Sequence, residues 1–174
     1  MTQLFLVSVV CPDRAGLIAA VAERLFDLGA NLGDAAFAVL GKGAEFTAVC
    51  DVPEGVTTGE IEAALKNLAE TDNGEITVRA FAYDQEKGDS GNITHRIEVG
   101  GGDRPGLVAR LAEVFEQYGA NIVRLNSTRS GSGMGASYAV RIAAHIPADC
   151  TESCLNTIAN TAGELGLKCR IDAA

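Results

Sequence analysis

The sequence has no tryptophan and few other aromatic side chains, with six Phe and three Tyr among 174 residues. Basic residues are also scarce, because 14 Lys and Arg stand against 23 Asp and Glu, a net charge of −9. A nucleic-acid-binding protein usually presents a basic surface and aromatic rings that stack on bases. Both are in short supply here, so we expect no direct binding to nucleic acid.

Long apolar runs are missing as well. No run approaches the roughly 18 residues of a membrane-spanning helix, and the N-terminal residues MTQLFLVSVVCPD lack the basic segment of a secretory signal. We therefore expect no membrane partner and a cytoplasmic location.

Cysteine occurs five times, an odd number that cannot close entirely into intrachain disulfides. There is no CxxC pair, and only two histidines could complete a zinc site around Cys150 and Cys154. The glycine spacing fits neither a phosphate-binding P-loop nor a dinucleotide-binding fingerprint. We expect no metal and no cofactor.

Glycine, in contrast, is abundant, with 20 residues. The segment 84–92, DQEKGDSGN, contains no apolar residue at all, which is typical of a linker between packed units. Five basic and twelve acidic residues precede it, whereas eight of each follow. We predict a first domain over 1–83, a linker over 84–92 and a second domain over 93–174.

The two halves share an internal repeat. Residues 13–31, DRAGLIAAVAERLFDLGAN, align at an offset of 90 with residues 103–121, DRPGLVARLAEVFEQYGAN. Ten of the nineteen positions are identical, including the Asp-Arg and Gly-Leu pairs at the start and Gly-Ala-Asn at the end. This degree of identity in register indicates a duplication.

Each copy has the same predicted element order. Apolar or alternating runs at 4–10 and 93–99 indicate first strands, and apolar stripes at helical spacing then end at Gly29 and Gly119. Hairpins follow, with turns at 41–43 and 130–135, and then second helices that open on the capping boxes Thr57 with Glu60 and Asp149 with Glu152. Closing strands are predicted at 75–83 and 167–172. The fold class is α+β: two ferredoxin-like βαββαβ domains, each an antiparallel four-stranded sheet with two helices on one face.

The repeated loop before the first helix is the best candidate for a binding site. A helix N-terminus presents unpaired N–H groups and the positive end of the helix dipole, and so attracts carboxylates or phosphates. A purely structural role is the alternative: Asp13 and Asp103 as helix caps, Pro105 in the first turn, and Gly16 and Gly106 for close packing. Asn31 and Asn121, which follow the helix-ending glycines, would then be ordinary turn residues.

The pattern D-R-x-G-L, a helix and G-A-N-[LI], found twice, resembles the ACT domain, a small ligand-sensing module of amino-acid metabolism. In length and tandem architecture the chain is similar to the glycine cleavage system transcriptional repressor group. The resemblance implies pairing of ACT domains, within the chain or in a homodimer, and an amino acid bound at the pair interface. The implied ligand-binding residues are Cys11, Pro12, Asp13, Arg14, Ala15, Gly16, Leu17 and Asn31, with Gly102, Asp103, Arg104, Pro105, Gly106, Leu107 and Asn121 in the second copy.

In that site the helix amides would hold the ligand carboxylate, and Asp13, Asp103 or an Asn oxygen would receive its ammonium group. Arg14 and Arg104 would support the carboxylate or point to solvent. The copies differ, because Ala15 stands where the second copy has Pro105, so their sites should differ in affinity.

Three functions remain in view. The first is a non-catalytic regulatory protein that senses an amino acid such as glycine and acts on a protein partner, for instance a transcription factor. The second is a ligand-independent interaction module. The third is an acylphosphatase-like hydrolase, for which Arg14 and Asn31 would have to hold phosphate, although no clear nucleophile or base accompanies them. His95 and His145 are predicted to be ordinary strand residues.

Overall fold

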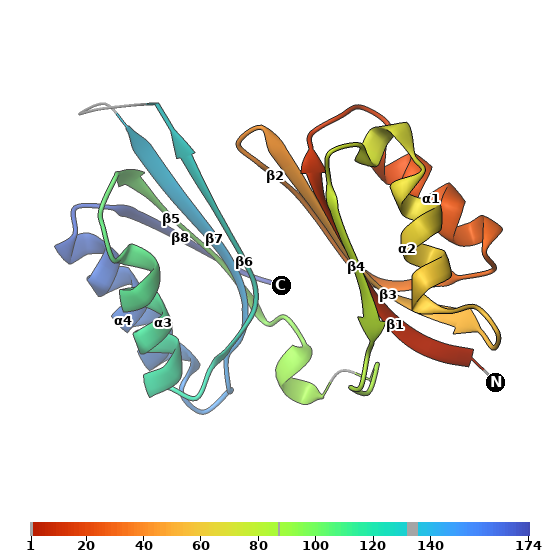
Figure 1. Ribbon diagram of the computed structural model, residues 1–174. Helices are drawn as coiled ribbons and strands as arrows, with labels where there is room; N and C mark the ends of the chain where they lie inside the picture. Colours follow the sequence, from red (N-terminus) through yellow and green to blue (C-terminus); the bar gives the residue numbers. More distant parts are fainter. Residues whose placement is uncertain (1, 87, 132–135) are drawn as a thin grey trace. The chain divides into compact units, whose positions relative to one another are not determined.

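The computed structural model describes residues 2–86, 88–131 and 136–174. The chain forms two compact units, 1–83 and 84–174. Within each unit, two α-helices cover one face of a four-stranded sheet (Figure 1). The fold class predicted from the sequence is confirmed.

The first unit follows the order βαββαβ. Its strands are β1 (Thr2–Pro12), β2 (Asn31–Leu40), β3 (Gly43–Pro53) and β4 (Glu75–Ala80), and its helices are α1 (Leu17–Asp27), α2 (Thr58–Lys66) and the short 3-10 helix η1 (Ala69–Thr71). The strands lie in the order β2-β3-β1-β4, and every neighbouring pair is antiparallel.

The second unit repeats this arrangement. After the 3-10 helix η2 (Asp89–Gly91) come β5 (His95–Gly102), α3 (Leu107–Gln117), β6 (Asn121–Ser130), β7 (Ser137–His145), α4 (Thr151–Glu164) and β8 (Lys168–Ala173). The sheet order is β6-β7-β5-β8, again antiparallel throughout. The predicted turn at 130–135 lies largely outside the described residues.

Each core lies between one sheet face and the helices, where the sequence periodicities place it. Alternate residues of β1 (Phe5, Val7, Val9 and Cys11) are buried against the stripe Leu17, Val21 and Leu25 of α1. In the second unit, Ile97 and Val99 are buried with Leu107, Leu111, Val114 and Phe115 of α3. The other face of each sheet is left without helices.

The helix caps were predicted correctly in one unit only. Thr57 and Glu60 form the capping box of α2, with each side chain bonded to the other residue's backbone N–H. The predicted box of Asp149 with Glu152 is wrong, because α4 begins one residue later, with Cys150 as its N-cap residue and no side-chain cap. A turn in which the Cys150 N–H donates to the Pro147 carbonyl (3.3 Å) sets that start.

The segment 84–92 is grouped with the second unit and makes contacts there. The Asn121 Nδ2 donates to the Ser90 carbonyl (2.8 Å), and His145 Nδ1 lies 3.1 Å from the Asn92 carbonyl oxygen. His95 and His145 occupy the first position of β5 and the last of β7. No helix in the described part of the chain is long and apolar enough to cross a membrane.

Candidate functional site

The loop between β1 and α1 is closed by a glycine in the left-handed region. Gly16 is the N-cap residue of α1, with a φ of 90°, and its carbonyl accepts the first helical bond, from the Ala20 N–H (2.9 Å). A Cβ built on Gly16 would meet nothing within 4 Å. The glycine therefore serves the backbone turn, and its expected alternative role in close packing is wrong.

The second copy repeats this backbone in detail. Gly106 is the N-cap residue of α3 with a φ of 82°, and the Arg110 N–H donates to its carbonyl (3.0 Å). Neither helix has a side-chain cap, so the capping roles considered for Asp13 and Asp103 are wrong. Pro105 precedes the N-cap residue rather than lying in the first turn.

Each loop leaves backbone donors free at the helix start. Among the described residues, the N–H groups of Ile18 and Ala19 in α1 have no hydrogen-bond acceptor, and neither do those of Val108 and Ala109 in α3. These donors stand at the positive end of the helix dipole. Both loops can therefore receive an anionic group from outside the fold.

The first loop borders an open hollow of about 380 Å³, which is lined by residues 13–19 and by Phe37 of β2. Asp13 is exposed and its carboxylate has no ion-pair or hydrogen-bond partner in the described part of the chain. Phe37 is 41% exposed and supplies an apolar wall. An unpaired acid, free amides and an apolar wall thus face the same space.

Phe37 is a residue that the motif-based prediction missed. It reaches the hollow because the β2–β3 turn folds back onto the loop, where the Asp13 N–H donates to the Lys42 carbonyl (2.9 Å). The available signal was weak: Phe37 is the only aromatic residue of β2 and lies close to the predicted hairpin turn.

The two loop arginines have a role that the prediction did not include. The Arg14 guanidinium donates to the carbonyl of Ala69 in η1, and the Arg104 Nε donates to the Leu165 carbonyl at the end of α4 (3.2 Å). Each arginine thereby ties its loop to the segment that follows the second helix. Both act first as positioning groups for the loop backbone.

The side chains around the second loop differ from those of the first. The Asp103 carboxylate pairs with Arg129 of β6 at 2.7 Å, and at an offset of 90 the first copy has Val39 in place of Arg129. Ser127 likewise stands where the first copy has Phe37. The second loop therefore offers a neutralised acid and has no counterpart of Phe37.

Several predicted site residues lie elsewhere in their own unit. Cys11 points into the core, and burial raises the pKa of its thiol; it does not line the hollow, and nor does Pro12. Asn31 lies opposite Asp51 of β3, which in turn lies opposite Leu4 of β1, whereas the loop begins after Pro12 at the other end of β1. Leu4 and Pro12 are eight residues apart along the strand, about 26 Å. Asn121, paired with His145, is at the corresponding far end of the second sheet.

Comparisons with known proteins agree on one family. Models of the ACT domain match residues 3–79 and 95–147. No curated protein sequence matches the chain.

Two solved structures resemble the chain over its full length. One is an unknown protein from Galdieria sulphuraria, with 20% identity, a TM-score of 0.76 and coverage of 100% of this chain and 99% of that one. The other is provisionally named a glycine cleavage system transcriptional repressor, with 16% identity, a TM-score of 0.69 and coverage of 100% and 98%. At these identities the likeness concerns the fold.

Proposed function

Since the chain belongs to the ACT-domain family, with two copies in tandem, we propose that it is a non-catalytic regulatory protein that senses an amino acid through the loop between β1 and α1. Its target is a protein partner, such as a transcription factor of amino-acid metabolism, rather than nucleic acid. Pairing of ACT units, within a chain or between two chains, is part of the same proposal.

One observation carries this proposal: an unpaired carboxylate and unpaired amides face a single hollow. An α-amino acid is a zwitterion, so its carboxylate would accept from the N–H groups of Ile18 and Ala19 while its ammonium group pairs with Asp13. The side chain of the bound amino acid would lie against Phe37, which favours a small or apolar side chain. Glycine is the smallest such ligand.

The residues Gly102, Asp103, Arg104, Pro105, Gly106 and Leu107 would form a second, weaker site. The Asp103 carboxylate is already paired with Arg129, so an incoming ammonium group would have to displace a guanidinium. We therefore assign primary sensing to the first loop. Asn31 and Asn121 have no part in either site within their own units.

A thermal-shift screen of the full chain against the twenty amino acids tests the proposal. A ligand at a hundred times its dissociation constant stabilises the native state by about 2.7 kcal/mol, enough for a clear rise in the unfolding midpoint. The rise should vanish in Asp13→Asn and persist in Asp103→Asn, which is the matched change in the other copy. A response lost equally in both variants, or in neither, contradicts the assignment to the first loop.

A ligand-independent interaction module is the second candidate, and exposed apolar residues of β2 favour it. Phe37, Val39 and Leu40 are 41%, 52% and 60% exposed at the end of an edge strand, where a partner strand or apolar surface could dock. A flat response to every amino acid, together with loss of partner binding in Val39→Asp, would favour this candidate. Hydrolysis of acetyl phosphate by the pure protein would instead overturn the non-catalytic proposal.

A further inference from the structure

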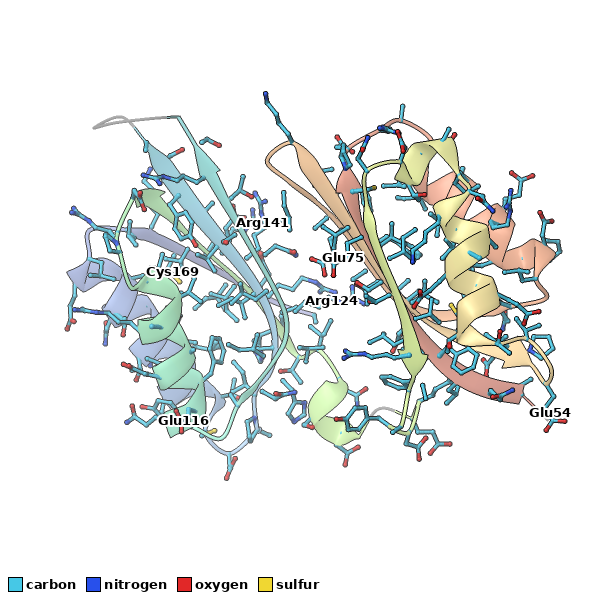
Figure 2. The ribbon with its side chains drawn as sticks, in the orientation of Figure 1. Glu54, Glu75, Glu116, Arg124, Arg141 and Cys169 are labelled. Atoms are coloured by element: carbon cyan, nitrogen blue, oxygen red, sulfur yellow. The ribbon has the colours of Figure 1, made fainter. Side chains whose placement is uncertain are left out.

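The face of the second sheet that carries no helices is charged. Its cross-strand register places Arg124, Ala143, Arg96 and Asp172 in one row, and Asn126, Arg141, Glu98 and Arg170 in the next. Residues in a row are about 4.8 Å apart from strand to strand. Four arginines from four different strands therefore gather on one small area, and Figure 2 shows Arg124 pointing away from α3 and α4.

This area is hollowed. A depression of about 380 Å³ is lined by all eight of these residues, with Ile93, Ile97 and Ile142. The register explains its shape, because the small Ala143 lies between the long side chains of Arg124 and Arg96 in its row, and Arg141 lies two residues away on its own strand. The volume falls within the range of small-molecule sites.

Two of the four arginines already have acidic partners. Arg141 pairs with Glu98 (3.2 Å), and Arg170 pairs with Asp172 (3.0 Å). Arg96 and Arg124, on either side of Ala143, form no ion pair among the described residues, and Asp172, the cross-strand neighbour of Arg96, is paired with Arg170. The lining of the hollow therefore has four arginines against two acids, although the second half of the chain is neutral.

The acids that balance these charges lie mainly on the other layer of the unit. Five of the eight acidic residues of the second half belong to α3, to α4 or to the turn before it: Glu113, Glu116, Asp149, Glu152 and Glu164. Positive charge is thus separated onto the open sheet face.

The fold itself does not require these arginines. In the first unit the corresponding rows hold Leu6, Val49 and Arg79, and Ser8, Thr47 and Thr77. Apart from Arg79, those positions form the same sheet with apolar and hydroxyl side chains. The pair Arg96 and Arg124 belongs to the second copy alone, because at an offset of 90 the first copy has Leu6 and Asp34.

From this hollow we propose a second binding site, distinct from the amino-acid loop, for a small molecule that carries two carboxylate or phosphate groups. Each anionic group would take one of the free guanidinium groups, a pairing that arginine favours because its planar donors match such oxygens. The Cα atoms of Arg96 and Arg124 are about 10 Å apart, two strand spacings, and their side chains can converge over Ala143. The rows contain no aromatic ring for base stacking, so a nucleic-acid strand fits the face less well.

Calorimetric titration of the full chain with pyrophosphate and, separately, with succinate tests the proposal and distinguishes the phosphate from the carboxylate source. Sodium chloride at equal ionic strength serves as the blank. We expect saturable binding of at least one anion, weakened about tenfold or more in Arg96→Gln and in Arg124→Gln, as for the loss of a charge-assisted hydrogen bond. Arg79→Gln, an exposed arginine on the open face of the first sheet, should bind as the wild type does.

Ala143→Leu provides a test that leaves every charge in place. It fills the floor of the hollow and should also weaken binding, whereas a merely electrostatic attraction to the face would survive it. Asp13→Asn, which removes the amino-acid response, should leave anion binding unchanged, so the two proposals fail separately. A flat titration with both anions, or wild-type affinity in Ala143→Leu, overturns the inference, provided that circular dichroism shows the variants folded.

Discussion

Gly74 lies where the first unit has no room for a side chain. It stands between η1 and β4, directly after Asn73, a non-glycine residue with a φ of 61°. A Cβ at Gly74 would lie 2.7 Å from the Cys11 Cβ, 2.8 Å from the Thr71 carbonyl oxygen and 3.0 Å from the Val10 carbonyl oxygen. We predict that Gly74→Ala destabilises the first unit strongly.

The magnitude follows from which neighbours can move. Two of the three contacts are backbone oxygens of the turn and of β1, and neither can rotate away as a long side chain would. Adding a methyl group to a tightly packed site typically costs about 1 to 3 kcal/mol, and the upper end applies here. For a unit of this size, about 3 kcal/mol lowers the unfolding midpoint by more than about 10 °C.

Gly59 provides the matched control. It lies in α2, and a Cβ built on it meets nothing within 4 Å. Gly59→Ala should therefore raise stability by about 0.5 kcal/mol, through reduced freedom of the unfolded chain, and the midpoint by about 2 to 4 °C. Thermal unfolding of the full chain, followed by circular dichroism, compares both variants with the wild type. A Gly74→Ala midpoint within 2 °C of the wild type would refute the steric reasoning, since about 2 °C corresponds to less than 1 kcal/mol.

Three further outcomes can be measured with the same protein. Thr71→Val removes a buried hydroxyl that bonds to the carbonyls of Leu65, in α2, and Leu68, just after it. The free energy of unfolding, measured in urea, should fall by about 1 to 3 kcal/mol. Hydrogen bonds from the backbone and then the side chain of Thr57 lower the pKa of Glu60. The stability that the Glu60 carboxylate gives the folded state is therefore present near neutral pH and is lost as pH falls through that lowered pKa. The difference in unfolding midpoint between the wild type and Glu60→Gln should shrink in acid. In native protein at pH 8, a thiol reagent should label half-buried Cys150 before Cys50 and Cys154, because burial raises the pKa values of those two thiols to about 11. Cys150→Ser should abolish the fastest phase of labelling.

The fold was predictable because its signals are local. Alternating apolar residues in β1 and helical stripes in α1 and α3 identify elements within a single turn or strand, and the duplication checks each assignment against the other copy. The capping box at Thr57 was equally local. At Asp149 the same kind of motif gave a wrong prediction, because the turn from Pro147 to Cys150 sets where α4 begins.

The candidate site was only partly predictable, since its walls come from a second strand. The motif located the loop itself, but the contribution of Phe37 depends on how the β2–β3 hairpin registers against β1. The pairing of Asp103 with Arg129 likewise depends on the register of β6. Asn31 was included by resemblance to a pocket built from two domains, and within its own unit it lies at the far end of the sheet.

The duplicated loops therefore differ through β2 and β6 rather than through the shared motif, and an exchange of two residues tests this directly. Val39→Arg places a guanidinium where Arg129 pairs with Asp103 in the other copy, so Asp13 should become paired and the amino-acid response should disappear. Arg129→Val frees Asp103 beside the unpaired amides of Val108 and Ala109, and should give the second loop a response that Asp103→Asn then removes. The thermal-shift screen measures both changes. If Val39→Arg still responds fully, the free carboxylate is not what makes the first loop a receptor for the ammonium group.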